Sequence, residues 1–152
     1  MATEDVIGAT LESLEKQFGR VMYAGIIDAI LGVLVLMAAI PTAIALGWSY
    51  WWVSLPQILY GALCLVVGVM AFLGVHWMFF AVPGMTMMGL TRNLSVISLI
   101  LSIISLIEII ASGIVYYNFS TLLLSIFPIV SIIINFYIAK AIDAIKLLPF
   151  PT

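Results

Sequence analysis

The stretch VMYAGIIDAILGVLVLMAAIPTAIAL, residues 21–46, contains one charged side chain, that of Asp28. As an α-helix it would be about 39 Å long, enough to cross the ~30 Å hydrocarbon core of a bilayer. A segment of this composition cannot form a soluble surface, so it faces lipid or is buried in protein. It therefore predicts a membrane-spanning helix.

The rest of the chain follows the same pattern. Between Arg20 and Arg92 the only charged residue is Asp28, and between Arg92 and Lys140 it is Glu108. Hydrophobic residues make up 65% of the chain and charged residues 8%, whereas soluble domains have about 45–50% and about 25%. Each of these two nearly uncharged intervals is long enough for two crossings and a tight turn. We expect the four membrane helices at residues 21–46, 53–80, 94–116 and 122–139.

The expected fold is all-α: an integral membrane four-helix bundle with antiparallel helices, preceded by a short N-terminal amphipathic helix. We divide the chain into the amphipathic helix (1–19), the four-transmembrane-helix domain (20–146) and a C-terminal tail (147–152). Apolar residues of the first part fall on one side of a helix, and most of its acids lie elsewhere. This helix either lies at the membrane interface or docks onto a partner, and its acidity disfavours strong attraction to anionic lipid.

The basic residues predict the orientation of the chain. Four crossings place both termini and the middle loop, residues 81–93, on one side of the membrane. That side carries all five basic residues, Lys16, Arg20, Arg92, Lys140 and Lys146. The opposite turns carry tryptophan and tyrosine, which prefer the headgroup layer. We therefore expect a multi-pass protein of the cell membrane with cytoplasmic N- and C-termini.

Small and polar residues recur at helical spacing in each expected span. Such residues mark the faces on which membrane helices pack, because lipid supplies little hydrophobic drive for association. Asn135 in the fourth span belongs to a stripe with Ser131. The packing positions that we predict in the other three spans are Gly32, Gly61, Cys64, Gly68, Ser102 and Ser105.

Asp28, Glu108 and Asn135 are the polar residues that call for an explanation inside the membrane. A lone acid there indicates a proton relay, an ion ligand or a docking charge, unless it is a structural carboxyl hydrogen-bonded to neighbouring serines. Counted along the helices, Asp28 lies roughly 12 Å inward from Arg20, and Glu108 roughly 24 Å inward from Arg92. The two acids are therefore not expected to touch. Asp28 matches the depth of Asn135, with which an interhelical hydrogen bond is expected.

Signatures of enzymatic chemistry are missing, so we expect no catalytic residues and no enzyme activity. We also expect no cofactor and no metal site. Met85, Met87 and Met88 with His76 could in principle hold Cu(I), but methionine more often fills irregular apolar contacts. With five basic residues and a net charge of −2, direct binding of nucleic acid is not expected.

The sequence favours a non-catalytic structural or accessory subunit of a larger membrane assembly. Its expected partners are membrane lipid and other transmembrane subunits or copies of itself. One alternative is a small proton or ion transporter or channel subunit that uses Asp28 and Glu108. Another is a hydrophobic helical structural protein of a virion or vesicle coat, in which helices pack without phospholipid.

Overall fold

The chain is almost entirely helical. The computed structural model describes residues 2–77, 82–115 and 122–147, and within them it has no β-strand. The elements in chain order are α1 (Ala2–Leu46), the 3-10 helix η1 (Trp48–Tyr50), α2 (Trp51–Trp77), α3 (Val82–Val115) and α5 (Ile126–Leu147). By length and composition, four of these helices could cross a membrane. The predicted all-α class is confirmed.

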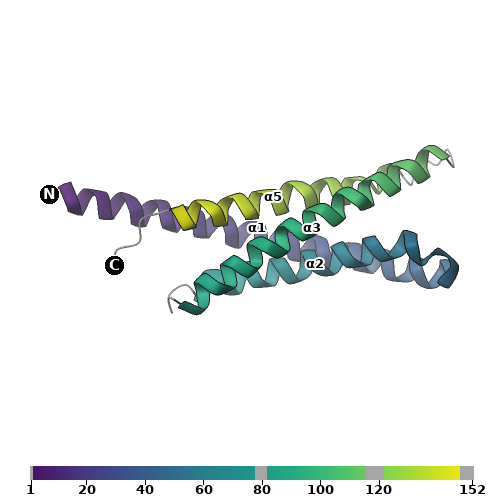
Figure 1. The fold of residues 1–152 in the computed structure, drawn as a ribbon, viewed down its shortest axis with the longest axis horizontal. Helices are drawn as coiled ribbons and strands as arrows, with labels where there is room; N and C mark the ends of the chain where they lie inside the picture. Colours follow the sequence, from purple (N-terminus) through teal and green to yellow (C-terminus); the bar gives the residue numbers. More distant parts are fainter. Residues whose placement is uncertain (1, 78–81, 116–121, 148–152) are drawn as a thin grey trace.

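The four long helices pack side by side (Figure 1). α1 contacts α2, α2 contacts α3, α3 contacts α5, and α5 contacts α1 again. The ring of contacts therefore closes around a shared interior, which can receive side chains from every helix. Figure 1 also shows the N-terminal part of α1 projecting beyond the ends of the other helices.

The first helix differs from the prediction. We expected a separate amphipathic helix over residues 1–19, but α1 runs without interruption from Ala2 to Leu46. The physical reason is that no helix breaker separates the two parts, since the one proline inside α1 is Pro41, close to its far end. The N-terminal segment is thus a continuation of the first apolar helix, and its position relative to a membrane stays a prediction.

The expected middle loop is wrong from residue 82 onward. α3 begins at Val82, twelve residues before the predicted start at residue 94. Pro83 occupies the first turn of α3, where a missing N–H group costs no hydrogen bond. The methionines that follow are good helix formers, so nothing delays the start of the helix.

The last helix is shifted toward the C-terminus. α5 spans Ile126–Leu147 instead of residues 122–139. Before it, the chain turns at Ser125, whose backbone N–H and hydroxyl both donate to the Leu122 carbonyl, at 3.1 and 2.6 Å. The charged end of α5 is helical as well. In this end, Asp143 Oδ1 lies 3.3 Å from Nε of Arg92, which is on α3. The predicted tail lies outside the described residues from position 148 on.

Glycines bring α1 and α2 into backbone contact. A Cβ atom on Gly32 would lie 2.5 Å from the Leu65 nitrogen and 2.6 Å from the Gly61 carbonyl oxygen. A Cβ on Gly68 would meet the carbonyl oxygen of Gly25. The contacts move to higher residue numbers along α1 and to lower residue numbers along α2, so these two helices run in opposite directions. Gly32, Gly61 and Gly68, three of the predicted packing positions, lie in this contact together with Gly25.

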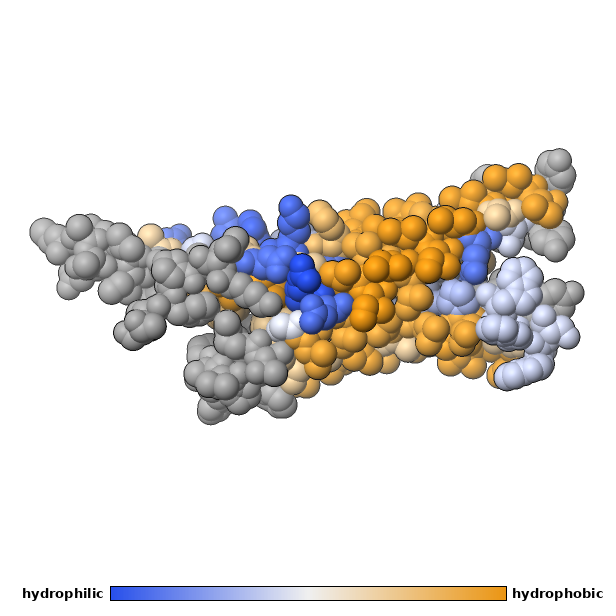
Figure 2. All heavy atoms as spheres, in the orientation of Figure 1, coloured by the Kyte–Doolittle hydropathy of each residue, from blue (hydrophilic) through white to orange (hydrophobic). Residues whose placement is uncertain are grey.

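The exterior of the helices is apolar. Large hydrophobic side chains are exposed on every long helix, for example Ile30, Leu59, Ile107 and Ile133. Figure 2 shows them as a continuous hydrophobic belt, bordered by hydrophilic residues on the side toward the N-terminal end of α1. A belt of this kind suits lipid or the surface of another membrane protein.

Candidate functional site

Polar side chains from all four long helices meet at one level of the interior. α1 contributes Asp28, α2 Cys64, α3 Ser98, and α5 both Ser131 and Asn135. Each of the five is 0% exposed. The small and polar stripes predicted from the sequence therefore do face one another, and together with Ser102 of α3, which is also fully buried, we call these residues the polar layer.

Asn135 is the centre of the polar layer. Its Nδ2 group donates to Asp28 Oδ1 at 3.2 Å and to the Ser131 carbonyl oxygen at 2.9 Å. The same nitrogen lies 3.6 Å from Cys64 Sγ. The hydrogen bond between Asp28 and Asn135, expected from their matching depth, is confirmed. It joins α1 to α5 across 107 positions of sequence.

The remaining members of the layer link α2 and α3 to α5. Cys64 Sγ lies 3.1 Å from Ser131 Oγ and 3.4 Å from Ser98 Oγ. Ser102 Oγ lies 2.7 Å from Ser131 Oγ and donates to the Ser98 carbonyl oxygen at 2.8 Å. Every long helix is thus tied into one hydrogen-bonded network, so the layer fixes how the helices pack.

Some atoms in this interior lack a hydrogen-bond partner among the described residues. They are Asp28 Oδ2, Asn135 Oδ1 and the hydroxyls of Ser95 and Ser105. Ser105, a predicted packing position, is fully buried, and its hydroxyl has no hydrogen-bond partner in the described chain. The layer contains a carboxyl, a thiol, an amide and hydroxyls, and none of the described basic side chains bonds to it.

Metal binding gains no support from the described residues. They contain no group of three or more histidine, cysteine or acidic side chains that could hold a metal ion. Met88, one of the predicted thioether candidates, is buried in an apolar cluster with Val67, Ala71 and Ile142. The side chains of His76 and Met85 lie outside the described residues.

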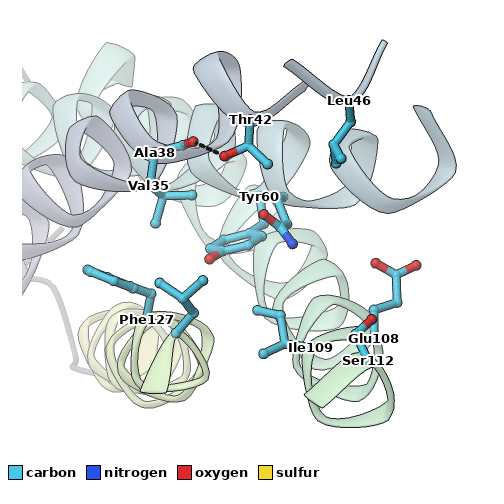
Figure 3. Close-up of a pocket in the computed structure, with 11 residues that line it drawn as sticks. Val35, Ala38, Thr42, Leu46, Tyr60, Glu108, Ile109, Ser112 and Phe127 are labelled. Atoms are coloured by element: carbon cyan, nitrogen blue, oxygen red, sulfur yellow. Dashed lines mark hydrogen bonds between the residues drawn. The ribbon is translucent and has the colours of Figure 1, made fainter. Parts of the chain in front are cut away.

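Glu108 occupies a different environment, a cavity of about 370 Å³ (Figure 3). Its Oε2 atom is buried and has no hydrogen-bond partner among the described residues. Tyr60, only 2% exposed, extends between the helices toward the middle of this cavity. We call it the Glu108 cavity. All four long helices line it, and the lining residues are Val35, Ala38, Thr42, Leu46, Gln57, Tyr60, Glu108, Ile109, Ser112, Leu124 and Phe127.

The two intramembrane acids are in separate places. Asp28 bonds Asn135 in the polar layer, whereas Glu108 lines a cavity to which Asp28 does not contribute. An apolar cluster containing Val35 and Tyr60 also includes Cys64 of the polar layer, and so lies where the two regions adjoin. The expectation that the acids do not touch is confirmed.

Sequence reasoning did not single out Tyr60 and Gln57 of the Glu108 cavity. A signal was available, because both precede Cys64 at helical spacing on α2, at four and seven residues. Spacing alone does not distinguish them, because tyrosine and glutamine near the end of a membrane helix are also ordinary interfacial residues.

Comparison with known proteins adds no relative. No family model, no curated protein and no solved structure matches this chain. Function is therefore argued from the polar layer, the Glu108 cavity and the apolar exterior.

Proposed function

We propose that this chain is an integral membrane protein, an antiparallel four-helix bundle that serves as a non-catalytic structural or accessory subunit of a larger membrane assembly. One observation carries the proposal. The polar layer joins the four helices to one another, while large apolar side chains on each of them face outward.

The division between interior and exterior supports this role. In lipid, helices associate through close packing and interhelical hydrogen bonds, and the glycine contacts and the polar layer supply both. The glycine contacts and the polar layer both hold the helices together, so neither provides a substrate path through the centre. The outward faces are then the surfaces available to membrane lipid, to other transmembrane subunits or to copies of the chain. The projecting N-terminal segment of α1 is available to the membrane interface or a partner.

We place the protein in the cell membrane as a multi-pass protein with both termini in the cytoplasm. The basic residues at one end and the tryptophan-rich turn around η1 at the other support this orientation. The native thiol of Cys64 is fully buried, so it leaves a low background for labelling.

Orientation is tested with Glu12→Cys and Ser49→Cys, two exposed positions near opposite ends of α1. A membrane-impermeant maleimide should label Ser49→Cys in intact cells, and Glu12→Cys only after lysis. Labelling of both variants in intact cells would contradict four crossings in this orientation.

The assembly role is tested by photo-crosslinking from single positions on the exterior. A photoreactive amino acid replaces Ile30, Leu59, Ile107 or Ile133, one on each long helix, and buried Val67 is the control. At least one exterior position should give a protein adduct of a single defined mass, and Val67 should give none. Only lipid adducts at all four positions, with a monomer after extraction in mild detergent, would refute the role.

A small transporter or channel subunit is the second candidate, and the Glu108 cavity favours it. A carboxyl oxygen without a hydrogen-bond partner in a cavity of about 370 Å³ could take a proton or a cation. The test is proton or ion flux in liposomes for the wild type and Glu108→Gln. Flux that the substitution abolishes supports transport; no flux in the wild type, or equal flux in both, refutes it.

A further inference from the structure

Two adjoining hollows lie between α1 and α5 at the basic end of the molecule. The larger, about 510 Å³, and the smaller, about 130 Å³, share Arg20 and Tyr137. They form one surface feature, which we call the basic seam. The other lining residues of the larger hollow are Lys16, Gly19, Tyr23, Ala24, Ile27, Ile133 and Ile134, and those of the smaller are Gln17, Lys140, Ala141 and Ala144.

Three of the five basic residues of the chain line the basic seam: Lys16, Arg20 and Lys140. In the described part of the chain, the only ion pair is that of Arg92 with Asp143, so none of the three has an acidic partner there. Glu12 and Glu15 are exposed nearby on α1 without forming one.

The positive charges of the seam come from two helices, and Lys140 Nζ on α5 also lies 5.3 Å from the centroid of the Phe136 ring. Lys16 and Arg20 are four residues apart on one uninterrupted helix, which places them on the same face, and Lys140 borders the smaller hollow from α5. Like charges at this spacing repel one another, so an anion between them would be stabilising.

The walls of the seam change from charged to apolar along its length. Arg20 is the last basic residue of α1, and the larger hollow continues past it along Tyr23 and Ile27 and along Ile133 and Ile134 of α5. Gly19 leaves space in the seam, because a Cβ there would meet no atom within 4 Å. A ligand that fits has an anionic head and an apolar chain.

We propose that the basic seam binds an anionic phospholipid. Its phosphate lies among Lys16, Arg20 and Lys140, and one acyl chain lies in the larger hollow between α1 and α5. The membrane supplies such a molecule at this depth, because Arg20 lies where the apolar part of the helix begins. This site stands whether the protein is an accessory subunit or a transporter.

The proposal is tested on the purified full-length chain in neutral detergent by native mass spectrometry. Phosphatidylglycerol, phosphatidylcholine or inorganic phosphate is titrated separately. The wild type should bind phosphatidylglycerol in preference to phosphatidylcholine, and Arg20→Gln and Lys140→Gln should each weaken it about fivefold. Arg92→Gln, which removes the same charge from the same end outside the seam, should leave the affinity within twofold.

The acyl-chain part is tested with Gly19→Leu, which adds an apolar side chain at the larger hollow, where a Cβ meets no atom within 4 Å, and removes no charge. Gly19→Leu should weaken the binding of phosphatidylglycerol at least fivefold. Gly8→Leu, at another unobstructed position of α1, should leave this binding unchanged. Equal affinity for the two lipids overturns the proposal. So does binding of inorganic phosphate as tight as that of the lipid, and so does a loss in Arg92→Gln that equals the loss in Arg20→Gln.

Discussion

The polar layer and the Glu108 cavity each contain one acid of the long apolar helices, yet the two acids differ in burial and in hydrogen bonding. Asp28 is fully buried and accepts a hydrogen bond from Asn135. Glu108 is only half-buried, and its buried oxygen has no hydrogen-bond partner in the described chain. An acid near the middle of an apolar helix can therefore be part of a helix contact or part of a cavity wall.

Side-chain size accounts for the difference. Around Asp28 the facing residues are small, chiefly Cys64, Ser98 and Ser131, and the glycines of α1 and α2 allow their backbones to touch on either side. Around Glu108 the cavity is lined by the bulky side chains of Tyr60 and Phe127. Close packing makes hydrogen bonds between small side chains possible, whereas bulky residues leave a cavity and an acid that reaches nothing.

The largest effect is expected where packing is tightest, at Gly32. In Gly32→Leu the new side chain would overlap backbone atoms of Leu65 and Gly61, which cannot move aside alone. We expect a loss of about 3 kcal/mol in the free energy of unfolding, at the upper end of overpacking effects. The measurement is unfolding by SDS in mixed micelles, monitored by circular dichroism.

The matched control is Gly8→Leu in the same helix, where a Cβ would meet nothing within 4 Å. It should be neutral or slightly stabilising, since leucine has the higher helix propensity. If the two variants unfold alike, α1 and α2 are not in backbone contact and the explanation of the polar layer by close packing fails.

The second effect concerns the hydrogen bond between Asp28 and Asn135. Asn135→Leu keeps the side-chain shape but removes the amide donor, so the buried carboxyl of Asp28 loses the hydrogen bond to its Oδ1 atom. A loss of about 1–3 kcal/mol is expected in the same unfolding assay. Asp28→Leu combined with Asn135→Leu should recover part of it, because no buried polar group is then stranded. A double variant that loses the sum of both single losses would show that the two residues are not coupled.

The polar layer was largely predictable from the sequence, and the ends of the helices were not. The layer follows from spacing: Gly32, Cys64, Ser102 and Asn135 recur in stripes, and a stripe of small or polar residues inside an apolar helix has to face protein. Helix ends depend on local competition instead. Pro83 could begin a helix or end one, and only the surrounding chain settles that it begins α3.

The Glu108 cavity was not predictable for a further reason. The volume of a cavity is the difference between the space that four backbones enclose and the volume that their side chains fill. The sequence of one helix alone determines neither quantity. Tyr60 and Phe127 come from different helices, and their joint effect on helix separation appears only when α2 and α5 are placed together.

A smaller effect is expected from Ser102, at the edge of the polar layer. Ser102→Ala removes the bond to the Ser98 carbonyl and the contact with Ser131 Oγ, although Ser131 keeps its contact with Cys64. Interhelical hydrogen bonds in membranes contribute about 0.6 kcal/mol on average, and a loss of this size is expected. Ser112→Ala, in the Glu108 cavity, is the control and should change the unfolding free energy by much less. Equal losses would remove the distinction between layer and cavity.

The smallest effect on stability is expected from Glu108 itself. Glu108→Gln keeps the shape of the side chain and breaks no hydrogen bond of the described structure, so the unfolding free energy should change by less than about 0.5 kcal/mol. A loss above about 1 kcal/mol would mean that Glu108 has a structural partner and that the cavity is closed in the folded protein. A stable Glu108→Gln protein has a second use, because any change it shows in flux or in crosslinking to other subunits then reports on the carboxyl and not on the fold.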